Sequence, residues 1–167
     1  MTTRRRRKSA IGGEIHKRWH IKGQVLCLLI GVAVAGYLAY SYTAGGSMVC
    51  GPGGGCEAVR ASAYAWIAGM PVPLVGLLAY SLLAMLLLVR LRAPRAVGYV
   101  ALLGMVTISV AAFVFSSYLT YVELFVLQLL CDWCLASFLV TAAIAGLLLD
   151  DARREARIFE DKKHARC

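Results

Sequence analysis

The chain has 167 residues, 60% of them hydrophobic, and carries a formal net charge of +9. Soluble domains are about 45–50% apolar, so this composition excludes an ordinary soluble protein and indicates a membrane protein short enough to form one domain. A charge this high invites a nucleic-acid-binding interpretation, but the positions of the charges along the chain argue against it.

Four segments are long and apolar enough to cross a bilayer, which takes about 20 residues of helix. They cover residues 25–42, 72–89, 97–116 and 124–149. We therefore expect an all-α membrane protein, a four-transmembrane-helix bundle over residues 25–149 between a basic tail (1–24) and a C-terminal tail (150–167). The third and fourth segments form one apolar run. We expect a tight hairpin at residues 116–123, because a single helix of that length would overshoot the bilayer.

The basic residues predict how the bundle lies in the membrane. Seventeen of the eighteen Lys and Arg residues lie before the first span, between the second and third spans, or after the fourth, and Arg60 is the exception. The positive-inside rule then places both termini in the cytoplasm and the loop 43–71 outside. We expect a multi-pass protein of the inner (plasma) membrane whose tails contact lipid headgroups rather than nucleic acid, with an RNA-binding tail as the alternative. The first span is not read as a signal peptide, because it has the length of a span and three more follow.

Four of the six cysteines fall on this outer side. Cys50 and Cys56 lie in the outer loop, and Cys131 and Cys134 form a C-x-x-C motif. On a helix this spacing places both sulfurs on one face, with side-chain roots about 5–6 Å apart, so the pair can alternate between a disulfide and a dithiol. We expect Cys131 about five to seven residues inside the outer end of the fourth span, roughly 10 Å deep. The remaining two cysteines are Cys27 and Cys167. We interpret Cys27 as a small buried apolar residue and Cys167 as an exposed thiol in a reducing compartment.

The outer loop divides into two pieces. The first is rich in glycine and is expected to be mobile; its glycines are Gly45, Gly46, Gly51, Gly53, Gly54 and Gly55. Residues 57–68 are rich in helix formers, so we expect a short amphipathic half-helix that lies at the outer interface as a lid, with Cys56 at its N-terminus and Gly69 as C-cap. The positive end of a helix dipole would favour the thiolate of Cys56 and therefore disulfide exchange.

Two cysteine pairs on one side of a membrane predict a redox relay. The loop pair can meet a soluble dithiol protein and reach down to Cys131. The final acceptor then lies beside Cys134, where an apolar two-electron carrier such as a quinone fits better than a nicotinamide. No Gly-rich dinucleotide fingerprint follows a strand, and Leu135 and Ala136 follow Cys134 where a c-type haem motif requires His.

Together these residues resemble the vitamin K epoxide reductase (VKOR) family, specifically its bacterial quinone-linked members, over residues 20–150 or so. The features that carry the resemblance are four spans, Cys50-x5-Cys56, Cys56-x5-Ser62 and Cys131-x-x-Cys134. The resemblance implies a membrane thiol-disulfide oxidoreductase that passes electrons to a quinone (menaquinone or ubiquinone) and supports disulfide formation in exported proteins.

By position, the resemblance also implies a role for each site residue. Cys50 is attacked by a thioredoxin-like or DsbA-like extracytoplasmic protein, Cys56 exchanges with Cys131, and Cys134 faces the quinone. Because the chain ends at Cys167 without a fused thioredoxin-like domain, we expect that partner to be a separate protein.

Three further residues are assigned to the quinone site. Ser62 supports the lid, and Phe138 and Trp66 are expected to lie, with Ser62, near the quinone. Animal members of the family carry a tyrosine where this chain has Phe138. The expected activity is therefore plain quinone reduction, with reduction of vitamin K epoxide as the alternative.

The residues leave other interpretations open. A structural disulfide, a metal site built from all four cysteines, or a non-enzymatic membrane scaffold would use the same sulfurs. The proteobacterial disulfide oxidase also couples thiols to quinone with four helices, but its C-x-x-C lies in the first outer segment. Asp132 is either a proton relay or a side chain that points to headgroup water. Trp66 and Trp133 fit interfacial anchors as well as quinone contacts, and Glu123 is expected to mark the outer hairpin and nothing more.

Overall fold

The computed structural model describes residues 2–45, 48–51 and 54–164, and the side chains of residues 18–45, 48–51 and 54–160. Its four long helices are α1 (Thr2–Ala44), α3 (Val72–Arg92), α4 (Arg95–Tyr121) and α5 (Asp132–His164). Between α1 and α3 lie α2 (Cys56–Ala61), a 3₁₀ turn (Ala63–Ala65) and the strands β1 (Trp66–Ile67) and β2 (Met70–Pro71). The segments long and apolar enough to cross a membrane are Arg18–Ala44, Val72–Arg92, Arg95–Leu127 and Asp132–Glu160. The expected all-α four-helix membrane bundle is confirmed, and the chain is a multi-pass membrane protein.

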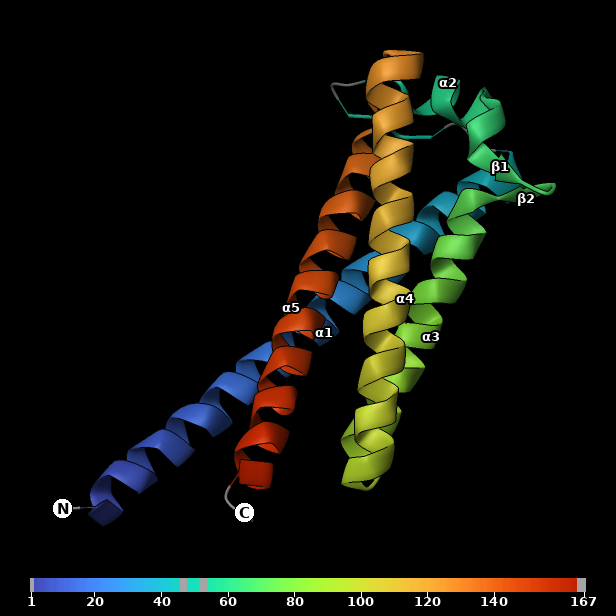
Figure 1. Cartoon of the computed structure of the whole chain (residues 1–167). Coiled ribbons are helices and arrows are strands. Elements are labelled where there is room, and N and C mark those ends of the chain that lie inside the picture. The colour runs from blue at the N-terminus through green and yellow to red at the C-terminus, as the bar shows by residue number, and fades with distance from the viewer. Residues whose placement is uncertain (1, 46–47, 52–53, 165–167) are drawn as a thin grey trace.

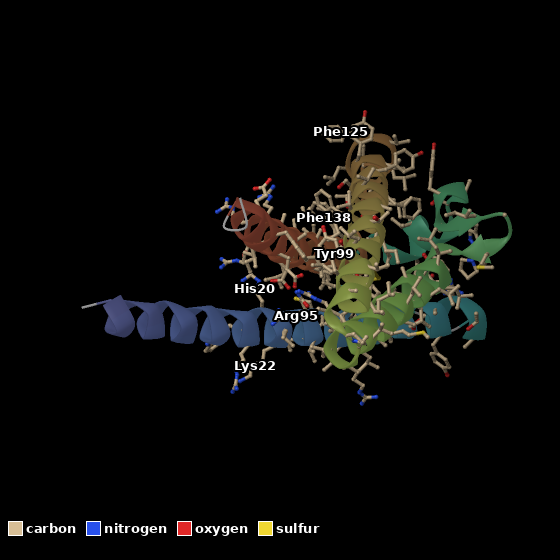
Figure 2. All side chains as sticks on the ribbon, turned by 60° about the horizontal axis from the view of Figure 1, so that its bottom comes forward. His20, Lys22, Arg95, Tyr99, Phe125 and Phe138 are labelled. Atoms are coloured by element: carbon tan, nitrogen blue, oxygen red, sulfur yellow. A yellow bond between two sulfur atoms is a disulfide. The ribbon has the colours of Figure 1, made fainter. Side chains whose placement is uncertain are left out.

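The long helices form a ring in which α3 and α5 each pack against both α1 and α4. Both termini lie at one end of the bundle, and α2 with the β1–β2 hairpin lies at the other (Figure 1). We call these the terminal end and the cysteine end. Leu83, Leu102 and Leu148 are among the residues that fill the interior. Lys22 and Phe125 point away from the bundle (Figure 2).

The turn between α4 and α5 lies later in the chain than the sequence predicts. Instead of a hairpin at residues 116–123, α4 continues to Tyr121 and then into a π-helical turn, Val122–Leu127. The polar residues near 116 do not break the helix, because their hydroxyls bond carbonyls of the preceding turn, as Ser117 does to Phe113 at 2.7 Å. The helix ends only at Gln128, which adopts the left-handed conformation with φ of 53°.

This later turn moves Cys131 to a new position. The fourth long helix, α5, begins at Asp132, so Cys131 directly precedes it instead of lying five to seven residues inside a span. The carbonyl of Cys131 accepts the N–H of Leu135 at 3.0 Å, which is the first hydrogen bond of the helix. The expected depth of roughly 10 Å along the helix is therefore wrong.

The expected twelve-residue half-helix is also shorter than predicted. The helix α2 ends at Ala61 because Ser62 adopts an extended conformation and its hydroxyl donates to the carbonyl of Val59 at 2.7 Å. The chain then forms the 3₁₀ turn and the β1–β2 hairpin. Ala68 and Gly69 connect its strands with φ values of 50° and 79°, as a two-residue hairpin turn requires. Gly69 therefore serves a hairpin turn and not a helix C-cap.

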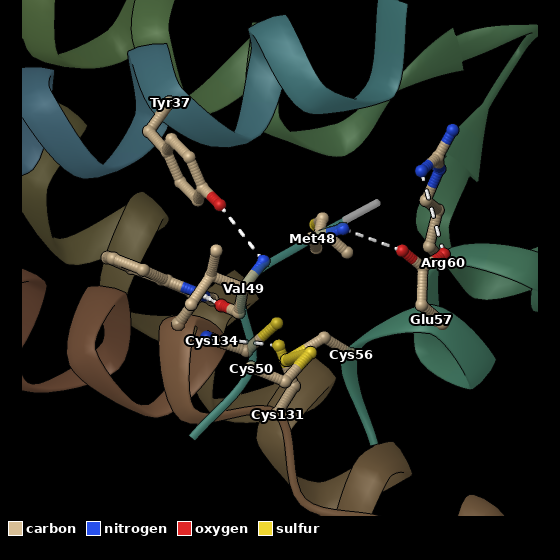
Figure 3. The surroundings of a disulfide bond; sticks show 10 residues. Tyr37, Met48, Val49, Cys50, Cys56, Glu57, Arg60, Cys131 and Cys134 are labelled. Atoms are coloured by element: carbon tan, nitrogen blue, oxygen red, sulfur yellow. Dashed lines mark hydrogen bonds and ion pairs between the residues drawn. A yellow bond between two sulfur atoms is a disulfide. The ribbon is translucent and has the colours of Figure 1, made fainter. Parts of the chain in front are cut away.

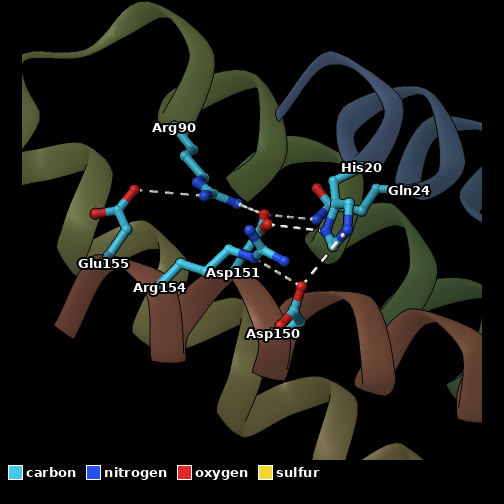
Figure 4. Close-up of polar contacts among 7 residues, drawn as sticks. All are labelled: His20, Gln24, Arg90, Asp150, Asp151, Arg154 and Glu155. Carbon is cyan, nitrogen blue, oxygen red and sulfur yellow. Dashed lines mark hydrogen bonds and ion pairs between the residues drawn. The ribbon is translucent and has the colours of Figure 1, made fainter. Parts of the chain in front are cut away.

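A buried ionic cluster ties three helices together at the terminal end (Figure 4). The carboxylate of Asp151 on α5 is 2.8 Å from an Arg90 guanidinium nitrogen on α3. It also lies 3.0 Å from Nδ1 of His20 and 2.9 Å from the amide nitrogen of Gln24, both on α1. Burying a charge in an apolar bundle is costly unless it is paired and hydrogen-bonded, so these contacts hold α1, α3 and α5 in register.

Candidate redox site

Four cysteines meet at the cysteine end of the bundle (Figure 3). Cys50 and Cys56 are joined by a disulfide with Cα atoms 6.0 Å apart, while Cys131 and Cys134 are free. Cys56 and Cys131, which are 0% and 2% exposed, belong to one apolar cluster, and Cys50 and Cys134 pack against it. The structure therefore brings the loop pair and the helix pair together. A metal site that uses four thiolates is incompatible with this state, because two of the sulfurs are bonded to each other.

The start of α5 stabilises a thiolate on Cys131. The backbone N–H of Cys134 donates to the sulfur of Cys131 at 3.3 Å, so this sulfur caps the helix N-terminus. The hydrogen bond from the Cys134 side chain lowers the pKa of the Cys131 thiol below its ordinary value, and this effect outweighs burial. A low thiol pKa at a helix N-terminus is typical of cysteines that exchange disulfides. The sequence had assigned this environment to Cys56, which lies at the start of the short α2 but is held in the disulfide.

Side chains from three elements anchor the described part of the loop around Cys50. The N–H of Val49 donates to the hydroxyl of Tyr37 at 3.1 Å, and the carbonyl of Val49 accepts the indole N–H of Trp133 at 2.8 Å. The N–H of Met48 donates to the Glu57 carboxylate at 2.8 Å. Trp133 thus holds the loop against α5, a role that neither sequence interpretation of this residue included.

Glycines let this loop lie directly against the segment that leads into α5. The N–H of Gly55 donates to the carbonyl of Leu130 at 3.1 Å, and a Cβ on Gly55 would lie only 2.7 Å from that oxygen. A Cβ on Gly51 would lie 2.7 Å from a carboxylate oxygen of Asp132. Gly55, one of the glycines that suggested mobility, is therefore needed for close approach to the backbone of Leu130. Two members of the expected mobile stretch, Gly46 and Gly53, lie outside the described residues, as does Cys167.

The contact with Gly51 also places Asp132. One of its carboxylate oxygens is buried and has no hydrogen-bond partner among the described residues. This oxygen faces the loop, so the interpretation of Asp132 as a side chain that points to headgroup water does not fit the structure.

A cavity of about 410 Å³ lies inside the bundle and reaches the helix pair of cysteines. Cys131, Cys134 and Ser62 line it at the cysteine end, and Tyr80 on α3 lines it further inside. Tyr80 is 4% exposed, and its hydroxyl lies close to the side chain of Ser137, which also lines the cavity. The volume and the mostly apolar wall with a few polar groups are typical of small-molecule sites.

Two residues assigned to the quinone from sequence do not line this cavity. Ser137 and Thr141 of α5 face it, and Phe138, one residue further around the helix than Ser137, stacks on Phe113 with ring centroids 5.7 Å apart. Trp66 lies on β1, 43% exposed, and donates its indole N–H to the carbonyl of Arg60 at 3.3 Å. Of the four residues assigned to the quinone, the structure places Cys134 and Ser62 at the cavity.

Glu123 is a site residue that the sequence analysis missed. It lies in the π-helical turn, is 4% exposed and lines the cavity. A carboxylate oxygen of Glu123 and the sulfurs of Cys131 and Cys134 all lie within 4.8 Å of one another. The expected hairpin at residues 116–123 placed Glu123 in a surface turn. An acid inside an unbroken apolar helical run would have been a signal for function.

Residues 24–149 match the model of a family described as the vitamin K epoxide reductase family. No curated protein matches the chain. The matched range contains all four clustered cysteines, Glu123 and the residues that line the cavity.

Proposed function

Because the chain belongs to the vitamin K epoxide reductase family and is thus a membrane oxidoreductase, we propose that it passes electrons from a thioredoxin-like protein to a membrane quinone. The path runs through Cys50/Cys56 and then Cys131/Cys134. The observation that carries this proposal is the contact between the two pairs, where the partly buried Cys50–Cys56 disulfide packs against a free, helix-capping thiol. The net result is disulfide formation in exported proteins.

Electrons enter at Cys50, the more accessible sulfur of its pair, since Cys56 is fully buried. A thiolate of the partner attacks the sulfur of Cys50, and Cys56 leaves as a thiolate. The second thiol of the partner then attacks the sulfur that the partner shares with Cys50. This releases the partner as a disulfide and leaves Cys50 and Cys56 reduced.

The second exchange takes place inside the chain. The Cys56 thiolate attacks Cys131 in the Cys131–Cys134 disulfide and releases Cys134, and Cys50 then attacks Cys56 and releases Cys131. Cys131 is a good leaving group in this step because its pKa is low. The product has the Cys50–Cys56 disulfide and a reduced helix pair, which are the bonding states in this structure.

The cavity fits a quinone of the menaquinone or ubiquinone type. Its walls are mostly apolar, the Tyr80 hydroxyl at its wall can donate to a carbonyl oxygen, and Cys134 also lines it. A bound quinone accepts two electrons and two protons. Cys131 and Cys134 supply the electrons as they close their disulfide. Phe138 packs on Phe113 away from the cavity, so this position supplies no hydroxyl there, which favours plain quinone reduction over epoxide reduction.

The charges support one orientation in the membrane. The end of α3, the start of α4 and the end of α5 lie toward the terminal end (Figure 1) and carry Arg90, Arg92, Arg95, Arg153, Arg154 and Arg157, whereas α2, which carries Arg60, lies at the cysteine end. The positive-inside rule then puts both termini in the cytoplasm and the cysteine end on the extracytoplasmic face of the inner (plasma) membrane. A separate thioredoxin-like or DsbA-like protein reaches the cysteines from that face.

The test is turnover of purified protein in detergent with a reduced thioredoxin-like protein and a soluble quinone analogue, followed by quinone absorbance. Serine at Cys50, Cys56, Cys131 or Cys134 should abolish turnover. The matched control is Cys27→Ser, because Cys27 is a free cysteine that packs in the bundle core on α1. Normal turnover by the Cys134→Ser variant would contradict the proposed path and favour a scaffold role.

A further inference from the structure

Glu123 is an acidic residue in an apolar setting that the exchange steps above do not use. The π-helical turn presents it to the interior, where its side chain lines the cavity. Its backbone carbonyl accepts the N–H groups of Gln128 and Leu129, the latter at 3.0 Å, which fixes the turn independently of the side chain. Single π-helical turns are frequent at functional sites. Ionisable residues inside membrane segments are costly to bury and are usually retained for a function.

The neighbours of the Glu123 carboxylate are the reacting atoms themselves. One of its oxygens lies within 4.8 Å of the sulfurs of both Cys131 and Cys134. Among the described residues, Tyr42 on α1 interacts electrostatically with Glu123 and with both sulfurs, and the Arg60 guanidinium on α2 lies 5.6 Å from the Tyr42 ring centroid.

A second acid, Asp132, also lies next to the cysteines in sequence. Its carboxylate faces Gly51 in the loop, and it does not line the cavity. Among the described residues, Glu123 is thus the carboxylate that lines the cavity beside the two thiols.

Proton balance at this site calls for an internal acceptor. Closing the Cys131–Cys134 disulfide from the dithiol releases two electrons and two protons, and a quinone takes up the same number of each. The helix N-terminus and the bond from Cys134 favour Cys131 as a thiolate, so of the two thiols Cys131 gives up its proton more readily. The remaining proton is on Cys134, whose sulfur lies at the wall of an apolar cavity.

We propose that Glu123 takes the proton of the Cys134 thiol as the disulfide closes and passes it to the quinone in the cavity. The Cys131 thiolate, the Cys134 thiol and the Glu123 carboxylate become a disulfide and a carboxylic acid, and two electrons pass to the quinone. Glu123 then returns to the carboxylate by giving up its proton to a quinone oxygen, and the second proton comes from solvent at the cysteine end. This inference rests on the proposed quinone-linked function.

The first test needs no quinone and reads the proton directly. The protein carries Cys50→Ser and Cys56→Ser, so that only the helix pair changes state, and it is poised in dithiothreitol redox buffers as dithiol and as disulfide. Infrared difference spectra should show the C=O stretch of a protonated carboxylic acid appearing as the disulfide forms. Glu123→Gln should remove this band and Asp132→Asn should keep it. A band that survives in Glu123→Gln, or that is lost only in Asp132→Asn, would overturn the proposal.

The second test is turnover with the soluble quinone analogue. Loss of a general acid or base typically costs about 100-fold or more, so Glu123→Gln should lower kcat by about 100-fold with little change in the KM for quinone. Glu123→Asp should restore part of the rate, and the exposed Glu160 provides the control Glu160→Gln, with normal turnover. Thermal unfolding of the isosteric Glu123→Gln variant shows whether it is folded. If Glu123→Gln turns over as fast as wild type, the proposed role of Glu123 is refuted but the quinone-linked function is not. If Cys134→Ser turns over, the quinone-linked function itself is refuted.

Discussion

Gly55 is the position at which a single methyl group should disconnect the two cysteine pairs. A Cβ there would lie 2.7 Å from the carbonyl oxygen of Leu130 and 3.1 Å from the Cβ of Leu129. Ordinary contact begins near 3.4 Å, so in Gly55→Ala the loop must retreat from the segment before α5 by about 0.7 Å. Cys56 is the next residue and would move with it, away from Cys131.

Misplacement of reacting groups by about 1 Å can slow a reaction about 100-fold. We therefore expect Gly55→Ala to slow electron transfer from the loop pair to the helix pair by about 10- to 100-fold. The assay is stopped-flow mixing of reduced partner protein with the oxidised enzyme, followed by acid quenching and mass spectrometry of alkylated cysteines. Reduction of Cys50–Cys56 by the partner should keep its normal rate, because Cys50 remains accessible.

Gly146 on α5 provides the matched control, since a Cβ there meets no atom within 4 Å. Gly146→Ala should keep the transfer rate and stabilise the helix by roughly 0.5–1 kcal/mol. A transfer rate in Gly55→Ala within twofold of wild type would show that the contact between the loop and Leu130 does not set the distance between the two pairs.

Three further predictions follow from other contacts. Replacing Arg90 by Met should lower the free energy of unfolding by about 3–5 kcal/mol, measured by thermal unfolding, because Asp151 loses the Arg90 guanidinium. The double variant Arg90→Met/Asp151→Leu should recover most of that stability. A loss below about 1 kcal/mol in the single variant would contradict a structural role for the ion pair. In the reduced protein, alkylation of Cys131 should rise with pH at a midpoint below that of an ordinary thiol, because its pKa is lowered, and Cys134→Ala should move the midpoint upward by removing the hydrogen bond that lowers it. Tyr80→Phe should raise the KM for quinone several-fold, because it removes a hydrogen-bond donor from the cavity wall; an unchanged KM would remove Tyr80 from the quinone site.

Hydropathy was sufficient to predict the bundle, because crossing a membrane requires long apolar helices and only these four segments of the chain are long and apolar enough. The cysteine spacing likewise indicated two pairs. What composition could not reveal was where helices end. Ser117 and its neighbours looked like a turn but bond back to their own helix, whereas Gln128, with no distinctive sequence signal, ends it.

The misplaced turn explains the main errors at the site. It put Cys131 inside a helix, so the capping of α5 by its sulfur was missed, and it put Glu123 on the surface. Tertiary contacts account for the rest. The glycines near Cys50 predicted mobility when judged alone, but Gly55 is required by the approach of the Leu130 backbone, and Gly51 lies against the side chain of Asp132. The partners of Asp151 come from helices far apart in sequence, and no local pattern predicts such a cluster.

The central claim is that the loop pair exchanges directly with the helix pair, and one measurement tests it most directly. The Cys50→Ser/Cys134→Ser variant leaves Cys56 and Cys131 as the two sulfurs that should react with each other. Mild oxidation followed by proteolysis and mass spectrometry should recover the Cys56–Cys131 disulfide as the main product. If both thiols instead remain free under conditions that close Cys50–Cys56 in the wild type, the proposed electron path between the two pairs is wrong.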